Sequence, residues 1–367
     1  MVITLRLSDA RARPAPAQQF PLWERVGRAA SGIDFLHPGS AYTGETLRTG
    51  SMGGTQSSVV HLAEALAERG HDVRVFNGVA SRQRTFGVEY LPIEDARGQT
   101  RGDVGISVAA PRAFWTTSFR VSILWLHNPL KGFRQVRRGT VLPMLKARPH
   151  FVLLGDYHSR NVPRWLPSSG RSIIHHGIAD EFHREGTTDA APQPRAIFTS
   201  QPYRGLDWLL GLWPEVRARV PGARFDVFAP KAHQANANAA KAALEGVLFR
   251  GSVARGALVQ ELASARVQLI PGHRDETYCL AAAEAIASGV PVVTLGEGSL
   301  SERVRDGETG FIAKDRDEFI ARSAALLADD ALWTRMHRAC LADSALATWD
   351  ARTGEWEALF ERLATPR

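Results

Sequence analysis

Two glutamates lie eight residues apart in the stretch PGHRDETYCLAAAEAIASGVPVVT, residues 271–294. Glu276 precedes an alanine-rich helical pattern and Glu284 lies within it. On one helix this offset would separate the two carboxylates by about 12 Å, so they cannot bind a single hydroxyl together. They can instead hold the two ends of an extended ligand. Free backbone N–H groups at the helix start favour a phosphate between them. These amides belong to Thr277, Tyr278, Cys279 and Leu280.

The ligand that fits this arrangement is a nucleotide-diphosphate sugar. Its sugar hydroxyls would bond Glu276, its pyrophosphate the amides, and its ribose hydroxyls Glu284. The alternative is an N-capping acid followed by a solvent-facing one. Spacing alone does not decide between the two interpretations, because a Glu–x7–Glu pair also arises by chance in a chain of this length.

The elements that must position these residues alternate between strands and helices. Residues 31–39 predict a short buried strand, and a polar glycine-rich loop follows. The next stretch predicts a helix that ends at Gly70, because four residues keep the spacing of one apolar face: Val59, Leu62, Ala63 and Leu66. With the strand HDVRVF at 71–76 this is a βαβ unit, which predicts a parallel sheet.

The same alternation continues to the C-terminus. Continuous apolar strands, as expected where helices cover both faces of a sheet, are predicted at 103–109, 121–127, 150–155 and 171–176. A second series begins at RAIFTS, residues 195–200. We therefore predict an α/β protein with two tandem doubly wound, Rossmann-like domains and a cleft between them. Its parts are an N-terminal domain (1–176), a linker (177–194), a C-terminal domain (195–345) and a terminal helix returning to the N-terminal domain (346–367).

Several motifs occur in the order known from one enzyme family. They are GGTQSSVVHLAEALAERGHDVRVF, SIIHHGIADEF, YRGLDWLL, VLFRGSVARGALVQELASARVQLIP, the glutamate stretch and TWDARTGEWEALFERL. Each is weak, but together they cover residues 50–365, and the chain resembles the retaining glycosyltransferases of family 4 (group 1, GT-B fold). The resemblance implies transfer of a sugar from a nucleotide donor, without a metal and without a cofactor beyond the nucleotide-sugar co-substrate.

The resemblance also assigns residues of the N-terminal half. Gly53 and Gly54, at the start of the first long helix, would let the backbone approach the diphosphate; a simple turn is the alternative. His127 ends a strand and would lie near the transferred sugar; a structural histidine is the alternative. His176 stands where the family usually has an asparagine.

Arg204 stands in place of a family lysine, at the start of a helix. A cation there is unfavourable for the helix dipole, which favours a role toward the donor phosphates. The family usually has a second cation a few residues earlier, and the stretch FTSQPY lacks it. The candidates to replace it are Arg250, Arg274 and Lys231.

In the mechanism that the resemblance implies, the acceptor attacks from the leaving-group face and the donor phosphate takes its proton. His127 and Glu276 then position the sugar, and no dedicated base is needed. The Asp–x–Asp pattern at 315–317 precedes a helical stretch, so N-capping explains it better than a metal site. We predict no catalytic metal. Signatures of zinc peptidases, serine hydrolases and P-loop or dinucleotide-binding proteins do not occur.

Charge and composition limit the partners. The net charge of +7 and pI of about 9.8 favour an anionic partner. Residues 104–155 contain eight Lys and Arg residues and no acid. The ordinary interpretation is a solvated basic face; the alternative is a surface around 112–148 for an anionic acceptor or membrane. Nucleic acid is not expected, because no recognisable module accompanies the charge.

Two separated cysteines and the lack of a span-length apolar run predict a cytoplasmic protein, or one peripheral on the inner membrane face. We expect the first 20 residues to be a loosely attached leader and the polar loop at 39–52 to shape an acceptor pocket. The favoured function is a nucleotide-sugar-dependent glycosyltransferase with an unidentified acceptor. The alternatives are a non-catalytic nucleotide-sugar-binding protein, a same-fold epimerase or phosphorylase, and a basic nucleic-acid-binding protein.

Overall fold

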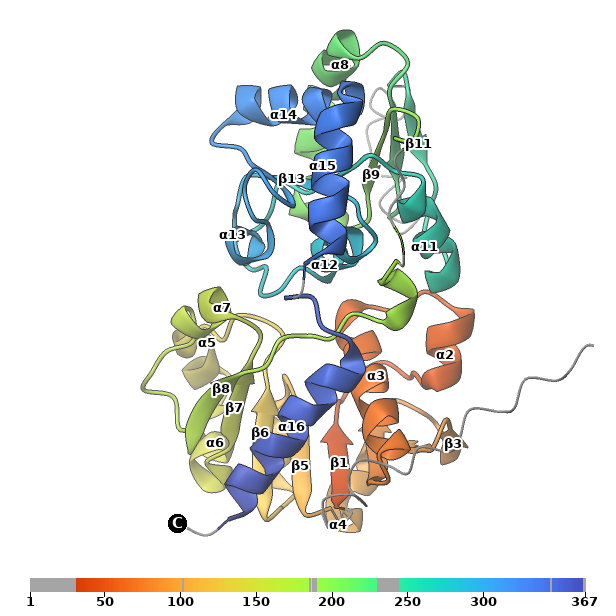
Figure 1. The fold of residues 1–367 in the computed structure, drawn as a ribbon. Coiled ribbons are helices and arrows are strands. Elements are labelled where there is room, and N and C mark those ends of the chain that lie inside the picture. The colour runs from red at the N-terminus through yellow and green to blue at the C-terminus, as the bar shows by residue number, and fades with distance from the viewer. Residues whose placement is uncertain are drawn as a thin grey trace, which may run out of the picture.

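The computed structural model describes residues 31–365 apart from 101, 185, 187–189, 230–243 and 344. Two sheets, each flanked by helices, form the lower and upper halves of the molecule in Figure 1. The predicted leader, the alanine-rich stretch after β10 and Lys231 lie outside the described residues.

The first sheet has the order β3-β4-β2-β1-β5-β6-β7-β8 and is parallel except for β3, which pairs antiparallel with β4. Its strands are β1 Gly32–Leu36, β2 Asp72–Asn77, β3 Gln83–Thr85, β4 Val88–Pro92, β5 Val104–Val108, β6 Val121–Trp125, β7 His150–Leu153 and β8 Gly170–Ile173. The six predicted strands are confirmed, whereas β3 and β4 were not predicted. All five residues of β5 are buried, as a central strand covered on both faces requires.

The second sheet has the order β11-β10-β9-β12-β13-β14 and is parallel throughout. Its strands are β9 Arg195–Phe198, β10 Arg224–Val227, β11 Val247–Phe249, β12 Val267–Leu269, β13 Val292–Thr294 and β14 Gly310–Ile312. Its helices are η4 Pro202–Arg204, α8 Leu206–Arg219, α11 Arg255–Ala263, α12 Leu280–Ala287, α13 Leu300–Arg303, α14 Arg316–Ala328 and α15 Asp330–Leu341. The alternating pattern predicted from 195 onward is confirmed.

The helices of the lower half include the one predicted to end at Gly70 and others that the sequence did not predict. They are α2 Gly44–Thr49, α3 Gly54–Glu68, η1 Ile93–Asp95, α4 Ala96–Gln99, η2 Pro111–Trp115, α5 Gly132–Arg137, α6 Val141–Ala147, α7 Asp156–Arg160 and, in the linker, η3 Asp180–Phe182. The four apolar residues predicted for one face of α3 are buried, and Gly70 adopts φ +90° just beyond its end. The expectation of a loop over 39–52 was wrong for residues 44–49, where α2 begins with a Thr43–Thr46 capping box.

The last helix, α16 Trp349–Ala364, crosses back from the upper half and packs on α3 and β6 (Figure 1). Arg69, at the end of α3, binds Asp350 at 2.7 Å and Glu357 at 2.9 Å on α16. Trp356 of α16 meets Trp125 of β6 edge to face, with ring centroids 5.0 Å apart. These contacts fix the C-terminal segment to the half that carries His127.

Candidate functional site

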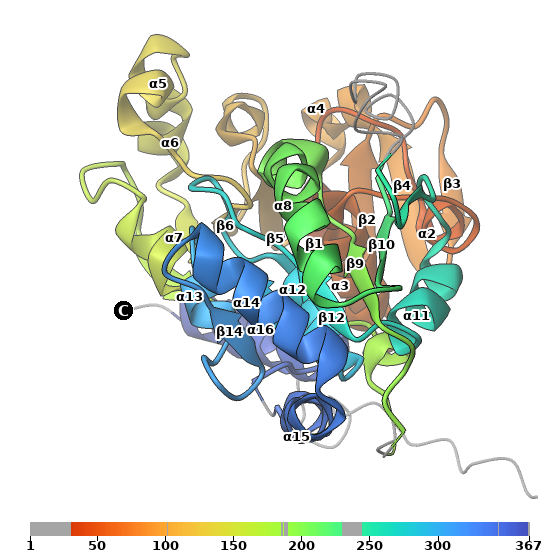
Figure 2. The ribbon, with the colours of Figure 1, turned by 90° about the horizontal axis from the view of Figure 1, so that it is seen from above.

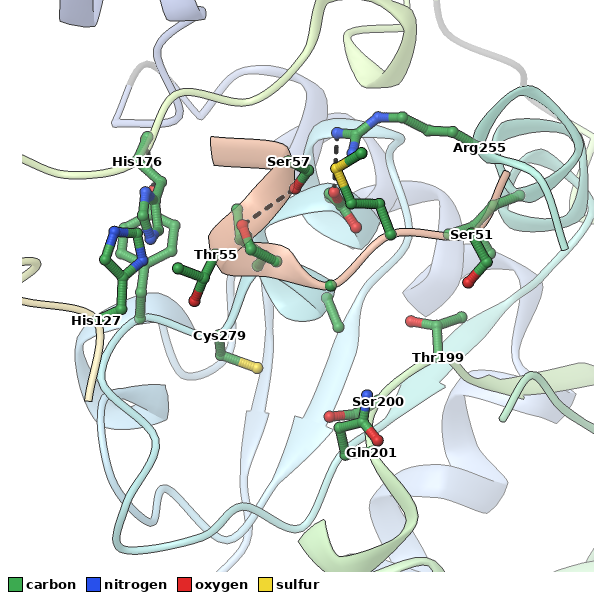
Figure 3. A pocket seen from close by; sticks show the side chains of 18 of the residues that line it. Ser51, Thr55, Ser57, His127, His176, Thr199, Ser200, Gln201, Arg255 and Cys279 are labelled. Atoms are coloured by element: carbon green, nitrogen blue, oxygen red, sulfur yellow. Dashed lines mark hydrogen bonds and ion pairs between the residues drawn. The ribbon is translucent and has the colours of Figure 1, made fainter. Parts of the chain in front are cut away.

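One cavity of about 320 Å³ lies between the two sheets, where the ends of β6 and β9 meet the starts of α3 and α12. Its size is that of a small-molecule site. Figure 3 shows side chains from both halves turned toward it. All ten residues predicted for catalysis or binding line this cavity: Gly53, Gly54, His127, Arg204, Glu276, Thr277, Tyr278, Cys279, Leu280 and Glu284.

The starts of α3 and α12 face each other closely across the cavity. A Cβ atom on Gly54 would lie 3.0 Å from Cδ1 of Leu280, so a side chain here would crowd the opposite domain. Gly205 has a similar role beside Arg204: its φ is +107°, and a Cβ there would lie 2.9 Å from Pro271. Glycine at this position therefore lets β9 turn sharply into α8 and present Arg204 to the cavity.

Glu276 lies in the loop before α12 and is 5% exposed. Its Oε1 atom accepts a hydrogen bond from the Cys279 amide at 3.1 Å, and its Oε2 atom forms an ion pair with Arg204. The assumption that one helix carries both glutamates was wrong, because α12 begins only at Leu280, after Cys279 in the left-handed conformation with φ +62°. The site thus places a carboxylate and a guanidinium side by side at the helix start.

Two of the predicted binding residues use their side chains to join the domains. Thr277 Oγ1 donates to the His127 carbonyl at 2.6 Å, and Tyr278 OH donates to the His176 carbonyl at 3.0 Å. Only their backbones are then available to a ligand. Burial raises the pKa of the Cys279 thiol, so the thiol stays protonated at neutral pH.

Glu284 is buried at the other end of the cavity, where Arg255 contacts it. The Arg255 Nη2 atom lies 3.0 Å from Glu284 Oε1, a contact dashed in Figure 3, and its Nε atom lies 2.7 Å from Glu181 Oε1. Burial raises the pKa of Glu284, and the Arg255 guanidinium opposes this shift. The sequence analysis did not identify Arg255. It is the first residue of α11, the same unfavourable dipole position that singled out Arg204.

His127 and His176 form a buried ring pair against Trp125, with their own centroids 5.0 Å apart. His127 Nε2 and His176 Nδ1 find no hydrogen-bond partner among the described residues. Desolvation lowers the pKa of His127 well below its ordinary value and that of His176 to about 3. Both imidazoles are therefore neutral at pH 7 and can hydrogen-bond a ligand without adding charge.

Replacing His176 with asparagine should reduce the sensitivity of folding to acid. Because the folded pKa of about 3 lies below the ordinary value, the stability from the neutral buried ring is present above pH 6.5 and declines as pH falls toward 3. Urea unfolding at pH 7.5 and at pH 5 measures this difference. Between these pH values the free energy of unfolding of the wild type should fall by about 2 kcal/mol more than that of H176N. Equal losses would contradict this account of the pair.

Two of the three candidates for a second phosphate-binding cation, Arg250 and Arg274, lie outside the cavity lining. Arg250 lies 3.5 Å from Glu261. Among the described residues the cations that line it are Arg204 and Arg255. Asp315 accepts from the Glu318 amide at 2.9 Å, which confirms the predicted N-cap of α14. In the described part of the chain no group of three or more His, Cys, Asp or Glu residues could hold a metal ion.

Comparison with known proteins places the upper half in a family. Residues 193–329 match the family model described as Glycosyl transferases group 1. These residues form a group 1 glycosyltransferase domain. The D-inositol 3-phosphate glycosyltransferase of Streptomyces scabiei is 30% identical to the chain over 206 residues, 52% of this chain and 44% of the relative. The D-inositol 3-phosphate glycosyltransferase of Streptomyces avermitilis is 37% identical over 106 residues, which are 28% of this chain and 23% of the relative. The chain thus spans less than half the length of these relatives.

Solved structures show that nearly the whole chain has the GT-B fold. Sucrose-phosphate synthase from Thermosynechococcus elongatus has a TM-score of 0.72 at 14% identity and covers 90% of this chain and 98% of its own. HepE from Anabaena, solved with UDP-glucose, has a TM-score of 0.68 at 14% identity, and the match covers 90% of this chain and 100% of HepE.

Among the described residues, no helix combines the length and the apolar character that a membrane span requires.

Proposed function

We propose that this chain is a retaining, metal-independent glycosyltransferase that moves a sugar from a nucleoside-diphosphate sugar to an acceptor hydroxyl. One observation carries the proposal: a single interdomain cavity gathers the glycines of α3, the start of α12, Arg204 and two buried carboxylates. The group 1 match and the UDP named for structures of the same fold support a nucleotide-sugar donor.

The geometry gives each residue a role in binding the donor. The Arg204–Glu276 pair sets a cation beside a carboxylate, which suits the point where a diphosphate joins a hydroxylated sugar. Arg204 and the amides before α12 would stabilise the departing diphosphate. Glu284 would bond the ribose hydroxyls, with Arg255 orienting its carboxylate. Neutral His127 would hydrogen-bond the transferred sugar.

The proposed reaction needs no protein base. The acceptor oxygen bonds to the anomeric carbon on the face from which the diphosphate leaves, and the bond from that carbon to the phosphate oxygen breaks. The acceptor proton passes to the departing phosphate. The protein supplies orientation and charge stabilisation.

A ligand panel tests this function. We expect one of UDP, GDP and ADP to raise the melting temperature, because ligand at 100 times its Kd adds about 2.7 kcal/mol to stability. The matching nucleotide sugar should be hydrolysed slowly in EDTA, with release of the sugar in the donor's anomeric configuration by NMR. Donor binding without any turnover would favour the non-catalytic binding protein. Salt-sensitive DNA binding without nucleotide binding would favour the nucleic-acid alternative.

We further propose that the basic region 112–148 contacts an anionic membrane. In Figure 2 α5 and α6 project at one edge of the lower half. Phe133 on α5 is 80% exposed, and Val136, Leu142 and Leu145 are each more than half exposed. Each helix thus presents an apolar pair at i, i+3, surrounded by arginine and lysine and by no acid from 104 to 155. Apolar side chains flanked by cations suit the surface of an anionic bilayer.

Replacing Phe133 and Leu142 with serine should weaken membrane binding. Burying such a side chain contributes about 1.5–3 kcal/mol, so partial insertion of two predicts at least a tenfold weaker partition. The measurement is sedimentation with phosphatidylglycerol and phosphatidylcholine vesicles at low salt. Leu248→Ser, an exposed leucine of the upper domain, is the matched control. Failure of the wild type to sediment with phosphatidylglycerol vesicles would overturn the proposal. If the wild type were a dimer in solution and F133S/L142S a monomer, a second copy of the chain would instead cover these apolar residues.

A further inference from the structure

A second cavity, of about 690 Å³, opens beside the first, between α5 and the upper domain. Its charged lining residues are Arg112, Lys131, Arg134, Arg138, Arg204 and Asp275. Five cations therefore face one carboxylate. An excess of positive charge in a concave site raises the local concentration of anions and favours their binding.

The partners of these cations leave three guanidinium groups without an acidic partner among the described residues. Lys131 lies 3.2 Å from Asp275, and Arg204 pairs with Glu276. No carboxylate among the described residues pairs with Arg134 or Arg138. Arg112 donates to the Arg138 carbonyl, which leaves that guanidinium free of an acidic partner as well. Guanidinium groups bind phosphate through paired, charge-assisted hydrogen bonds.

The two cavities adjoin each other. Asn128 and Arg204 line both of them, and His127 lies next to Asn128 on the wall of the first. A molecule whose anionic group sits between Arg134 and Arg138 would therefore extend past Asn128 toward the place proposed for the donor sugar. The predicted loop at 39–52 contributes Leu47 and residues 50–52 to the first cavity and none to the second.

We propose that this second cavity is the acceptor subsite, and that it selects an acceptor carrying both a hydroxyl and a phosphate group. The inference rests on the proposed transferase function and deepens it by naming the acceptor class. The phosphate belongs either to a soluble phosphorylated sugar or polyol or to a lipid headgroup. Because Phe133 and Val136 lie on the same short helix as Arg134, α5 can contact a bilayer while its cations line the cavity.

Calorimetry with saturating UDP tests the subsite, because UDP occupies the donor cavity and prevents phosphate from binding there. We expect glucose 6-phosphate to bind at least ten times more tightly than glucose. Arg134→Gln with Arg138→Gln should weaken that binding at least tenfold and should leave UDP affinity unchanged. Arg137→Gln is the matched control, since Arg137 is exposed on the same helix and does not line the cavity.

Vesicles of phosphatidylinositol and of phosphatidylcholine distinguish the two sources of phosphate. A lipid headgroup predicts sedimentation with phosphatidylinositol that glucose 6-phosphate displaces and that R134Q/R138Q loses. A soluble acceptor predicts glucose 6-phosphate binding without this competition. Absence of binding by both probes, or equal binding by the double variant and R137Q, overturns the subsite. Absence of binding by UDP, GDP and ADP alike would instead overturn the proposed transferase function.

Discussion

Replacing Glu276 with glutamine is expected to lower kcat/KM for sugar transfer by about 10²–10³-fold, the usual cost of removing one oriented polar group from a transition state. UDP affinity should change much less. The glutamine side-chain oxygen can still accept from the Cys279 amide, so the loop before α12 keeps its conformation. What is lost is the negative charge beside Arg204, where the proposed mechanism places the anomeric carbon as it becomes positive.

Glu302→Gln is the matched control for this substitution. Glu302 also lies at the boundary of the two domains, where it accepts from the Tyr157 amide and pairs with Arg160 at 3.2 Å, but it does not line the cavity. If E302Q reduced transfer as much as E276Q, the effect would come from loosened domain contacts. Full turnover by E276Q would refute the role given to Glu276.

The sequence predicted the parts of the fold that depend on local pattern. Continuous apolar strands and the amphipathic face of α3 arise from hydrophobic periodicity, so their positions were recovered within a few residues. The short edge strand β3 was missed because it spans three largely exposed residues, too few for an alternating pattern. The extent of α12 was overestimated because its alanine-rich pattern does not reveal the left-handed Cys279 that begins it.

The sequence identified the part of the candidate site that one continuous stretch of residues forms. It did not identify the part that depends on contacts between distant segments. Residues of the stretch from Glu276 to Glu284 line the cavity, where the family resemblance predicted a binding site. Arg255 reaches Glu284 from a separate helix 29 residues earlier in the chain, and nothing in the sequence pairs the two. Likewise, the sequence showed the basic stretch without acids. Only the structure shows that Arg134 of α5 lines a cavity while the apolar residues Phe133 and Val136 of the same helix are exposed.

Replacing Arg255 with methionine is expected to destabilise the protein by about 3–5 kcal/mol, because it leaves a buried carboxylate without its cation. Methionine preserves much of the apolar volume of a side chain whose guanidinium carbon lies 4.7 Å from the centroid of the Phe182 ring. The loss should depend on pH. Burial already raises the pKa of Glu284, and removal of the guanidinium raises it further. The folded state then binds a proton that the unfolded state releases, so stability falls as pH rises above the ordinary glutamate value.

Urea unfolding of R255M, E284Q and the double variant at pH 5 and pH 8 tests this account. R255M should be closer to the wild type at pH 5, where Glu284 can be protonated, and furthest from it at pH 8. Adding Glu284→Gln should recover much of the loss, since the pair is then replaced by neutral groups rather than broken. A pH-independent loss, or an R255M/E284Q double variant as unstable as R255M alone, would show that Arg255 acts through Glu181 or Phe182 instead. In that case the orientation of Glu284 toward a ribose would need another cause.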